Sequence, residues 1–416
     1  SARQCRLDGR SRSSSRGDGL MSFRKVVGTG ERTAANMLIA QTTQCWAAPD
    51  VTDFGIGQPQ DAILPVGILH KAASRQAADG RRHSLQYGTE FGDGHLRLAL
   101  ADFLSVHYAI VVDPEPIFIT NGNSQAIDIV CTAFTKPGDV VFVEEPSYFL
   151  ALDIFRNHHL TIVGIPVDEH GLSVEALEAA LEEHTPTLIY TIPAFHNPAG
   201  VTLSAERRQR LVELAVQHGF LIVADEVYQL LDYLGDTPAP MAAHLDSGRV
   251  LSLGTFSKIL APGLRLGWIQ AEMSLLQRLA KTAYVVSGGG LNPYTSSIVQ
   301  CVIEQGWLAD YLQTLRALYR ERTDVMHNAL MRHFPKNITY RKPTGGYFFW
   351  LKFAPDIDTA QFLDKARELK VGFRAGSAFS VSGGQKNFMR LSFAFYGADR
   401  IEAGIERLAH AVSGSR

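Results

Sequence analysis

The feature that most constrains the fold is a series of seven short apolar runs, separated by segments of helical periodicity. The runs are IFIT (117–120), VVFVE (140–144), LTIVGIP (160–166), TLIYT (187–191), FLIVAD (220–225), VLSLG (250–254) and LGWIQ (266–270). Strands that are apolar along their whole length are buried on both faces, as in a parallel sheet between two layers of helices. The sequence therefore predicts an α/β fold, with a mostly parallel (mixed) sheet flanked by helices in one large domain.

The segments between the runs support this interpretation. SVEALEAALEEH (173–184) and SAERRQRLVELAVQHG (204–219) repeat apolar residues every three or four positions, which is typical of helices packed on a sheet. After residue 305 a long helical pattern from Trp307 to His333 is followed by shorter helix-like and strand-like pieces, including FMRLSFAF (388–395). We therefore expect a smaller α+β domain at the carboxyl end.

Four segments are expected along the chain: a leader at 1–20, an N-terminal segment at 21–60 that contributes to the small domain, the large domain at 61–320 and the small domain at 321–416. Residues 1–20 are rich in Arg, Ser and Gly and too poor in large apolar residues to fold alone. They are interpreted as a disordered leader or as added residues ahead of a native start at Met21. A transit-like peptide is the alternative, although the segment has two aspartates and no clear apolar face.

Composition excludes several classes of function. The net charge of −2 in 416 residues gives no field to attract nucleic acid, and no segment approaches the ~20 apolar residues of a membrane span. The four cysteines lie at 5, 45, 131 and 301, without the spacing of a zinc site. We expect reduced thiols, a cytoplasmic location, and no metal, nucleic-acid or membrane partner.

Polar residues follow several of the predicted strands, where ligands of parallel sheets bind. Asn123 and Ser124 open a helix, whose free N–H groups favour an anion, although for this stretch alone an ordinary helix cap is the better explanation. Asn197 stands in HNPAG, where a Pro-rich turn is the alternative explanation. Asp225 ends the run FLIVAD, where a carboxylate is partly desolvated and needs a partner. Lys258 follows VLSLG, between hydroxyl residues and an apolar run.

In this order, these stretches resemble the class I and II aminotransferases, which are pyridoxal-phosphate enzymes of fold type I. The resemblance covers most of the chain. It rests on DFGIGQP (53–59), YGTEFGDGHLR (87–97), KPGDVVFVEEPSY (136–148), HNPAG (196–200), ADEVY (224–228), TFSKILAPGLRLG (255–267), PTGGYFFW (343–350) and NFMRLSF (387–393).

The resemblance implies a role for each matching residue. It implies that Lys258 forms a Schiff base with the cofactor aldehyde, while Asp225 pairs with the pyridine nitrogen. The ring would be held by Tyr228 and Asn197 at its hydroxyl and by Tyr148 on its face. The phosphate would be surrounded by Asn123, Ser124, Thr255, Ser257, Arg265 and, from the neighbouring subunit of a homodimer with shared active sites, Tyr87. The substrate would contact Gly57, Asn197 and Arg390. Packing alone is an alternative role for Tyr148 and Tyr87, and a structural role for Ser257.

The chemistry of transamination agrees with these roles. Removal of an α-proton leaves a carbanion, and a pyridine ring that stays protonated beside Asp225 can delocalise it. Lys258 is needed as an imine-forming amine and then as the base that moves the proton between two carbons. The planar fork of Arg390 suits both oxygens of a carboxylate.

Two stretches depart from the family pattern. The phosphate turn reads Asn-Ser-Gln, where relatives often begin with a smaller residue, so a contact from Asn123 is less expected than one from Ser124. SGGGLNPY (287–294) is unusually rich in glycine. It is interpreted either as room for a large substrate side chain or as a mobile segment.

The fold alone does not fix the reaction. Transamination between an L-amino acid and a 2-oxo acid is favoured by Arg390 and the motif set. A lyase or an enzyme like the aminocyclopropane-carboxylate synthases is the alternative. Some regulators join this fold to a DNA-binding module, but we expect none here, because only some 50 residues precede DFGIGQP.

The absence of basic residues from one segment narrows the class of amino donor. No lysine or arginine occurs between Arg32 and Lys71, where relatives that prefer acidic side chains commonly place one. The sequence therefore predicts a donor with an apolar or aromatic side chain, of the aromatic, kynurenine or aminoadipate group of enzymes, with 2-oxoglutarate or pyruvate as acceptor.

Overall fold

The computed structural model describes residues 44, 48–80 and 82–413. The chain divides into two compact units, Ser1–Ala48 and Pro49–Arg416, and every element below belongs to the second unit. The predicted leader at 1–20 and most of the segment at 21–60 lie outside the described residues. The domain boundaries expected at 61–320 and 321–416 stay a prediction.

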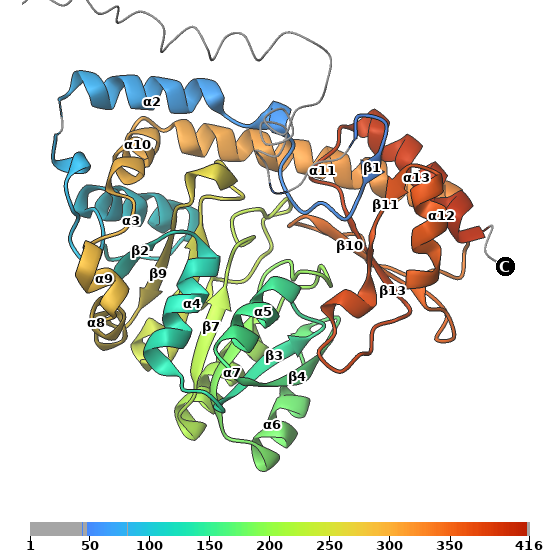
Figure 1. Cartoon of the computed structure of the whole chain (residues 1–416), viewed down its shortest axis with the longest axis horizontal. Helices are drawn as coiled ribbons and strands as arrows, with labels where there is room; N and C mark the ends of the chain where they lie inside the picture. Colours follow the sequence, from blue (N-terminus) through green and yellow to red (C-terminus); the bar gives the residue numbers. More distant parts are fainter. Residues whose placement is uncertain (1–43, 45–47, 81, 414–416) are drawn as a thin grey trace, which may run out of the picture. The chain divides into compact units, whose positions relative to one another are not determined.

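An eight-stranded sheet forms the centre of this unit, in the order β2-β9-β8-β7-β6-β3-β4-β5 (Figure 1). Its strands are β2 (Ile117–Thr120), β3 (Val140–Glu145), β4 (Thr161–Asp168), β5 (Gly171–Leu172), β6 (Pro186–Thr191), β7 (Leu221–Asp225), β8 (Val250–Thr255) and β9 (Gly267–Ala271). The pairs from β8 through β7, β6 and β3 to β4 are parallel, and β9 and β5 are antiparallel to their neighbours. The predicted α/β fold with a mostly parallel, mixed sheet is confirmed.

Side chains from both faces of the sheet are buried. Phe142 and Ile189 belong to a core with α6 and α7, whereas Val143 and Tyr190, one position further along, belong to a second core on the other face. Successive side chains of a strand point to opposite faces, so a strand covered on both sides must be apolar throughout. This is why the strands appear in the sequence as continuous apolar runs.

Helices cover both faces of the sheet and extend beyond it (Figure 1). They are α2 (Val66–Ala78), α3 (Gly94–Tyr108), α4 (Asn123–Phe134), α5 (Phe149–Asn157), α6 (Val174–Glu183), α7 (Ala205–His218), α8 (Met273–Ala280), α9 (Ala283–Gly288), α10 (Pro293–Glu304), α11 (Trp307–His333), α12 (Leu363–Glu368) and α13 (Ala398–Ser413). Helix α7 shows the local reasons: the Ser204 side chain caps its first turn, and Gly219 ends it with a φ of 83°.

A second, three-stranded antiparallel sheet is built near the carboxyl end, in the order β10-β13-β12. It consists of β10 (Phe348–Lys352), β13 (Phe388–Ser392) and β12 (Arg374–Ala375). A further pair joins β1 (Thr52–Asp53) to β11 (Val371–Gly372), so the beginning of the described chain lies against its last part (Figure 1).

The sheet brings the predicted site residues to one edge. Because β2, β3, β6, β7 and β8 run in the same direction, the segments that follow their carboxyl ends meet there. These segments carry Asn123, Tyr148, Asn197 and Lys258, and Asp225 is the last residue of β7.

Candidate active site

Lys258 lies just beyond β8, and its side chain reaches the segment after β1. The ammonium Nζ donates to the carbonyl oxygen of Gly57 at 2.8 Å and lies 5.3 Å from the centre of the Tyr347 ring. A Cβ added to Gly57 would come within 3.1 Å of the Phe348 ring, so a larger residue there would require the ring to shift. Lys258 and Gly57, 201 positions apart in the sequence, are therefore in direct contact.

Asp225 is buried, and each of its carboxylate oxygens accepts a hydrogen bond. Asn123 Nδ2 donates to Oδ1 at 2.5 Å, and the Tyr190 hydroxyl donates to Oδ2 at 2.8 Å. Burial raises the pKa of Asp225, while the two donors and the charge of Lys258 act in the opposite direction. The two hydrogen bonds fix the plane of the carboxylate and favour its charged form.

The position of Asn123 differs from the role expected for it. The family resemblance implies that Asn123 lies beside a phosphate, but the side-chain amide of Asn123 contacts Asp225 instead. The Oδ1 atom of Asn123 is buried and has no hydrogen-bond partner. Asparagine is long enough to cross from the start of α4 to the end of β7, which a smaller residue is not. Its backbone N–H still belongs to the first turn of α4.

The expected phosphate side is formed by the first turn of α4 and the loop after β8. The Arg265 guanidinium donates to the Asn121 carbonyl at 3.2 Å, and a Cβ on Gly122 would lie 3.0 Å from Arg265 Nη2. Thr255 Oγ1 and Ser257 Oγ are 3.0 Å apart. A cation, two hydroxyl groups and the positive end of a helix thus gather at one place, which suits an anion. Ser124 lies in the same turn and is exposed.

Arg390 lies on β13, and its guanidinium is held by two acceptors from distant parts of the chain. Nη1 donates to Asn197 Oδ1 at 2.9 Å, and Nη2 donates to the Gly55 carbonyl at 2.7 Å. Nε is buried without a hydrogen-bond partner. The guanidinium therefore retains donors for a ligand, and the structure brings Asn197 and Arg390 together.

Aromatic rings surround this guanidinium. Its Cζ is 4.2 Å from the ring centre of Phe348 and 4.8 Å from that of Phe379. Burial lowers the pKa of Arg390 to about 10, so the group still carries its charge at neutral pH. A buried cation with an incomplete set of acceptors favours an anionic ligand.

The three predicted tyrosines have different surroundings. Tyr228 is 3% exposed, packs against the Tyr347 ring, and has its pKa raised by burial. Tyr148 is half-buried and precedes α5. Tyr87 is 85% exposed, so its ring is not part of the core of the single chain.

Sequence reasoning missed two buried polar groups of this region. Tyr190, inside the run TLIYT, holds Asp225. Glu144 accepts from the Thr191 hydroxyl at 2.8 Å and from the Ile192 N–H at 2.7 Å, and its Oε2 lies 3.0 Å from His196 Nε2. This carboxylate ties the end of β3 to the end of β6. A carboxylate or hydroxyl in an otherwise apolar run signals a buried partner, as it did for Asp225.

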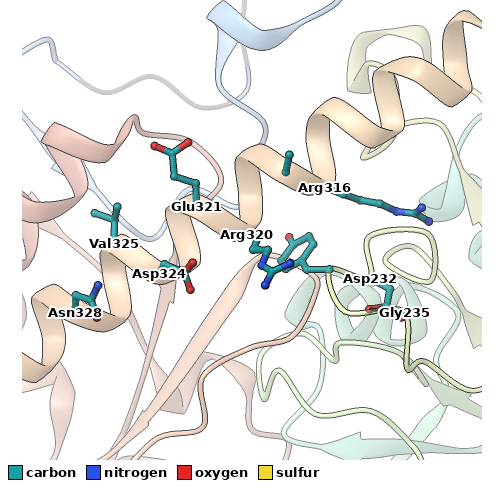
Figure 2. Close-up of a pocket in the computed structure, with 10 residues that line it drawn as sticks. Asp232, Gly235, Arg316, Arg320, Glu321, Asp324, Val325 and Asn328 are labelled. Atoms are coloured by element: carbon teal, nitrogen blue, oxygen red, sulfur yellow. Dashed lines mark hydrogen bonds between the residues drawn. The ribbon is translucent and has the colours of Figure 1, made fainter.

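A separate hollow of about 650 Å³ runs along α11 (Figure 2). Its lining includes Asp232, Arg316, Arg320, Glu321 and Asp324. None of the predicted site residues lines this hollow, so its place in the fold adds nothing to the candidate active site. Among the described residues there is also no group of three side chains that would hold a metal ion.

Comparisons with known proteins agree with the geometry. The profile of the family "Aminotransferase class I and II" matches residues 49–408. An aromatic-amino-acid aminotransferase of Thermococcus litoralis is 38% identical over 87% of this chain and 88% of its own length. A 2-aminoadipate transaminase of Thermus thermophilus is 30% identical over 95% of this chain and 98% of its own length.

A solved aminotransferase structure is also similar to this chain. The Pyrococcus horikoshii kynurenine aminotransferase, in complex with PMP, has a TM-score of 0.83 and 32% identity. The match covers 95% of this chain and 98% of that protein.

Proposed function

Because the chain belongs to the class I and II aminotransferases, and is thus a pyridoxal-phosphate-dependent transaminase of fold type I, we propose that its amino donor is an L-amino acid with an apolar or aromatic side chain. The observation that carries this proposal is the absence of lysine and arginine between Arg32 and Lys71, because an acidic donor side chain would need a cationic partner. The name of the Thermococcus relative supports the same substrate class.

The described residues fit the cofactor. A buried carboxylate suits the pyridine nitrogen, and the group of Arg265, Thr255, Ser257 and the start of α4 suits the phosphate. A Cβ on Gly122 would crowd Arg265, so the glycine keeps that side open to the guanidinium. The bound cofactor would supply an aldehyde carbon for the amino group of the substrate and a ring that can take up the electron pair of the broken C–H bond.

Each residue then has a specific task. The Lys258 amine holds the cofactor and afterwards carries the α-proton on Nζ from one carbon to the next. The Asp225 carboxylate keeps the ring nitrogen protonated, and Tyr228 and Asn197 orient the ring. Arg390 binds the substrate carboxylate with the donors that Asn197 and Gly55 leave unused. Tyr148 would cover the ring face, and Ser124 would add an N–H group to the phosphate site.

We expect the protein to work as a homodimer with shared active sites. Tyr87, Leu85, Tyr284 and Val286 are large apolar side chains between 62% and 85% exposed. An exposed apolar surface of this kind is typical of a protein interface. Tyr87 would then contribute to the phosphate site of the partner subunit.

A cytoplasmic location is also proposed. Cys131 is buried and forms no disulfide in the part of the chain that the structure describes, which suits a reducing compartment. Across that same part, no helix has both the length and the apolar character that a membrane span requires.

The test compares the rates at which the holoenzyme reacts with different amino donors. Each reaction is measured by the loss of the visible absorption band of the holoenzyme and by the release of an oxo acid. We expect phenylalanine, leucine and methionine to react faster than glutamate or aminoadipate. The opposite ranking contradicts the proposed donor class. Release of ammonia or of a cyclic product identifies a lyase or synthase instead. Borohydride reduction should leave a stable adduct on Lys258, and a Lys258→Ala chain should show none.

A further inference from the structure

Asn197 lies in a tight turn, and His196 closes that turn with both its backbone and its side chain. The His196 N–H donates to the Val201 carbonyl at 2.8 Å, and the Gly200 N–H donates to the His196 carbonyl at 2.7 Å. The imidazole adds a third bond, because its Nδ1 accepts from the Ala199 N–H at 3.1 Å. The ring of His196 is therefore part of the turn that carries Asn197.

The imidazole lies against a buried carboxylate. Since Nδ1 accepts a hydrogen bond, the proton of the neutral ring is on Nε2. Nε2 lies 3.0 Å from Glu144 Oε2, and both side chains are only 1% exposed. Glu144 is fixed in turn, because it accepts from the Thr191 hydroxyl and from the Ile192 N–H. The His196 ring is thus enclosed between the ends of two strands and the turn.

The turn begins with a residue in an unfavourable backbone conformation. Phe195 has a φ of 49°, in the left-handed region that a bulky side chain rarely adopts. Such a conformation persists only where its surroundings enforce it. On one side, Gly345 and Gly346 pack tightly on Phe195, since a Cβ on Gly346 would lie 2.6 Å from Phe195 Cβ. On the other side, the bonds of His196 hold the chain.

The turn presents the Asn197 amide to two partners. Its Oδ1 accepts from Arg390 Nη1 at 2.9 Å, which leaves Nδ2 to donate to the ring hydroxyl of the cofactor. Asn197 and Arg390 are both buried, so water cannot easily replace either partner. A shift of the turn would therefore disturb the carboxylate site and the ring contact together.

We propose that His196 is a positioning residue for the reaction: its ring, oriented by Glu144, fixes the turn that holds the Asn197 amide between Arg390 and the cofactor ring. This inference rests on the proposed function, which assigns the substrate carboxylate to Arg390. His196 acts through Asn197. Its loss should change carboxylate binding and the absorption of the cofactor, which a loss of stability alone does not do.

Three substitutions of His196 separate its two contacts. His196→Asn keeps an acceptor close to the place of Nδ1 and should hold the turn. His196→Gln keeps a donor that reaches toward Glu144 and lacks that acceptor, and His196→Leu removes both. Thr191→Val is the matched control, because it removes one hydrogen bond to the same Glu144 and leaves the bonds of the turn in place.

The first measurement is the binding of 3-phenylpropionate, a carboxylate without an amino group, to each holoenzyme. We expect its Kd to rise about 5- to 30-fold in His196→Leu, as for one weakened hydrogen bond to a charged group. His196→Gln should behave in the same way. In His196→Asn and Thr191→Val the Kd should stay within about three-fold of the wild type.

The second measurement is the visible absorption band of the holoenzyme as a function of pH. A donor to the ring oxygen favours its ionised form, so a weaker contact from Asn197 should raise the pH midpoint at which the band shifts. We expect a rise of about half to one pH unit in His196→Leu. Thr191→Val should keep the midpoint of the wild type.

Urea unfolding of each holoenzyme shows whether His196→Leu and Thr191→Val lose similar stability. Unchanged binding and an unchanged midpoint in His196→Leu would overturn the role of His196, and so would equal changes in Thr191→Val. If His196→Leu does not fold, His196→Gln decides in its place. A wild type that binds 3-phenylpropionate no better than Arg390→Gln contradicts the proposed carboxylate site instead, and the pH midpoint still decides the role of His196.

Discussion

At the scale of single residues, Asp225 shows how burial and hydrogen bonding oppose each other in one carboxylate. Burial raises its pKa, whereas the hydrogen bonds from Asn123 and Tyr190 lower it. A carboxylate that must stay ionised beside a pyridine nitrogen depends on the balance between these effects. The Asn123 amide is therefore more than a cap of α4.

Replacement of Asn123 by alanine should shift the acid limb of the pH–activity profile. Removing a donor to the charged form raises the pKa of Asp225 further, and activity is lost as the pH falls through that pKa. The shift of the acid limb in kcat/KM should be about one to two pH units upward, at saturating cofactor.

Gln125→Ala is the control for this change, since Gln125 lies in the same helical turn and accepts from the Asn121 N–H. Its acid limb should match that of the wild type. An Asn123→Ala profile that also matches the wild type would show that the amide does not tune Asp225.

The sequence could predict the site residues that lie at strand ends, but not their partners. The structure brings Lys258 to Gly57 and Arg390 to Asn197. The contact between Asn123 and Asp225 could not be foreseen, because it depends on the distance across the edge of the sheet between α4 and β7. Tyr190 was hidden inside a run that was interpreted only as a strand.

At the scale of elements, the Gly-rich segment after α9 has a structural role that neither earlier interpretation included. Gly289 and Gly290 pair with Gly88 in isolated β-bridges. A Cβ on Gly290 would lie 1.9 Å from the Thr89 carbonyl oxygen and 2.9 Å from Gly92 Cα. The glycines let two backbone segments touch, and one of these segments carries Tyr87.

Gly290→Ala should therefore destabilise the fold. The added methyl group meets backbone atoms, which cannot rotate away, so the free energy of unfolding should fall by about 1–3 kcal/mol. Urea unfolding measures this change.

Gly288→Ala supplies the comparison, because a Cβ there meets no atom within 4 Å. Its free energy of unfolding should stay within about 0.5 kcal/mol of the wild type. Equal stability of the Gly290→Ala protein would mean that the two segments separate readily.

Element boundaries were largely predictable, and their spatial order was not. The strand at 117–120 and the helix from Trp307 to His333 were placed at the residues where the structure has them. The spacing of apolar residues predicts such boundaries, because burial on one or two faces of an element determines which nearby positions are apolar. The strand order β2-β9-β8-β7-β6-β3-β4-β5 depends on crossovers between distant segments, which no local pattern specifies.

At the scale of the whole molecule, the proposed homodimer would give Tyr87 a function. The side chain is largely exposed in one chain, and the surface beside it is apolar. If each active site contains a residue from the other subunit, two inactive variants with different defects can form one intact site when they share a dimer.

Mixing Tyr87→Phe chains with Lys258→Ala chains should restore activity. A mixed dimer has one site with an intact lysine and an intact tyrosine, so random exchange of subunits should recover about a quarter of the wild-type activity. The rate is measured before and after subunit exchange, with each variant alone as the reference. No recovery, despite proven exchange, would mean that each site is complete within one chain.

The long separation between the partners of Arg390 has a consequence for synthesis. Its guanidinium bonds to Gly55, a residue made 335 positions earlier. During synthesis, Asp225 and Lys258 are added to the chain long before Arg390, the residue proposed to bind the substrate carboxylate. The grip on the substrate carboxylate can therefore form only after almost the whole chain has been made.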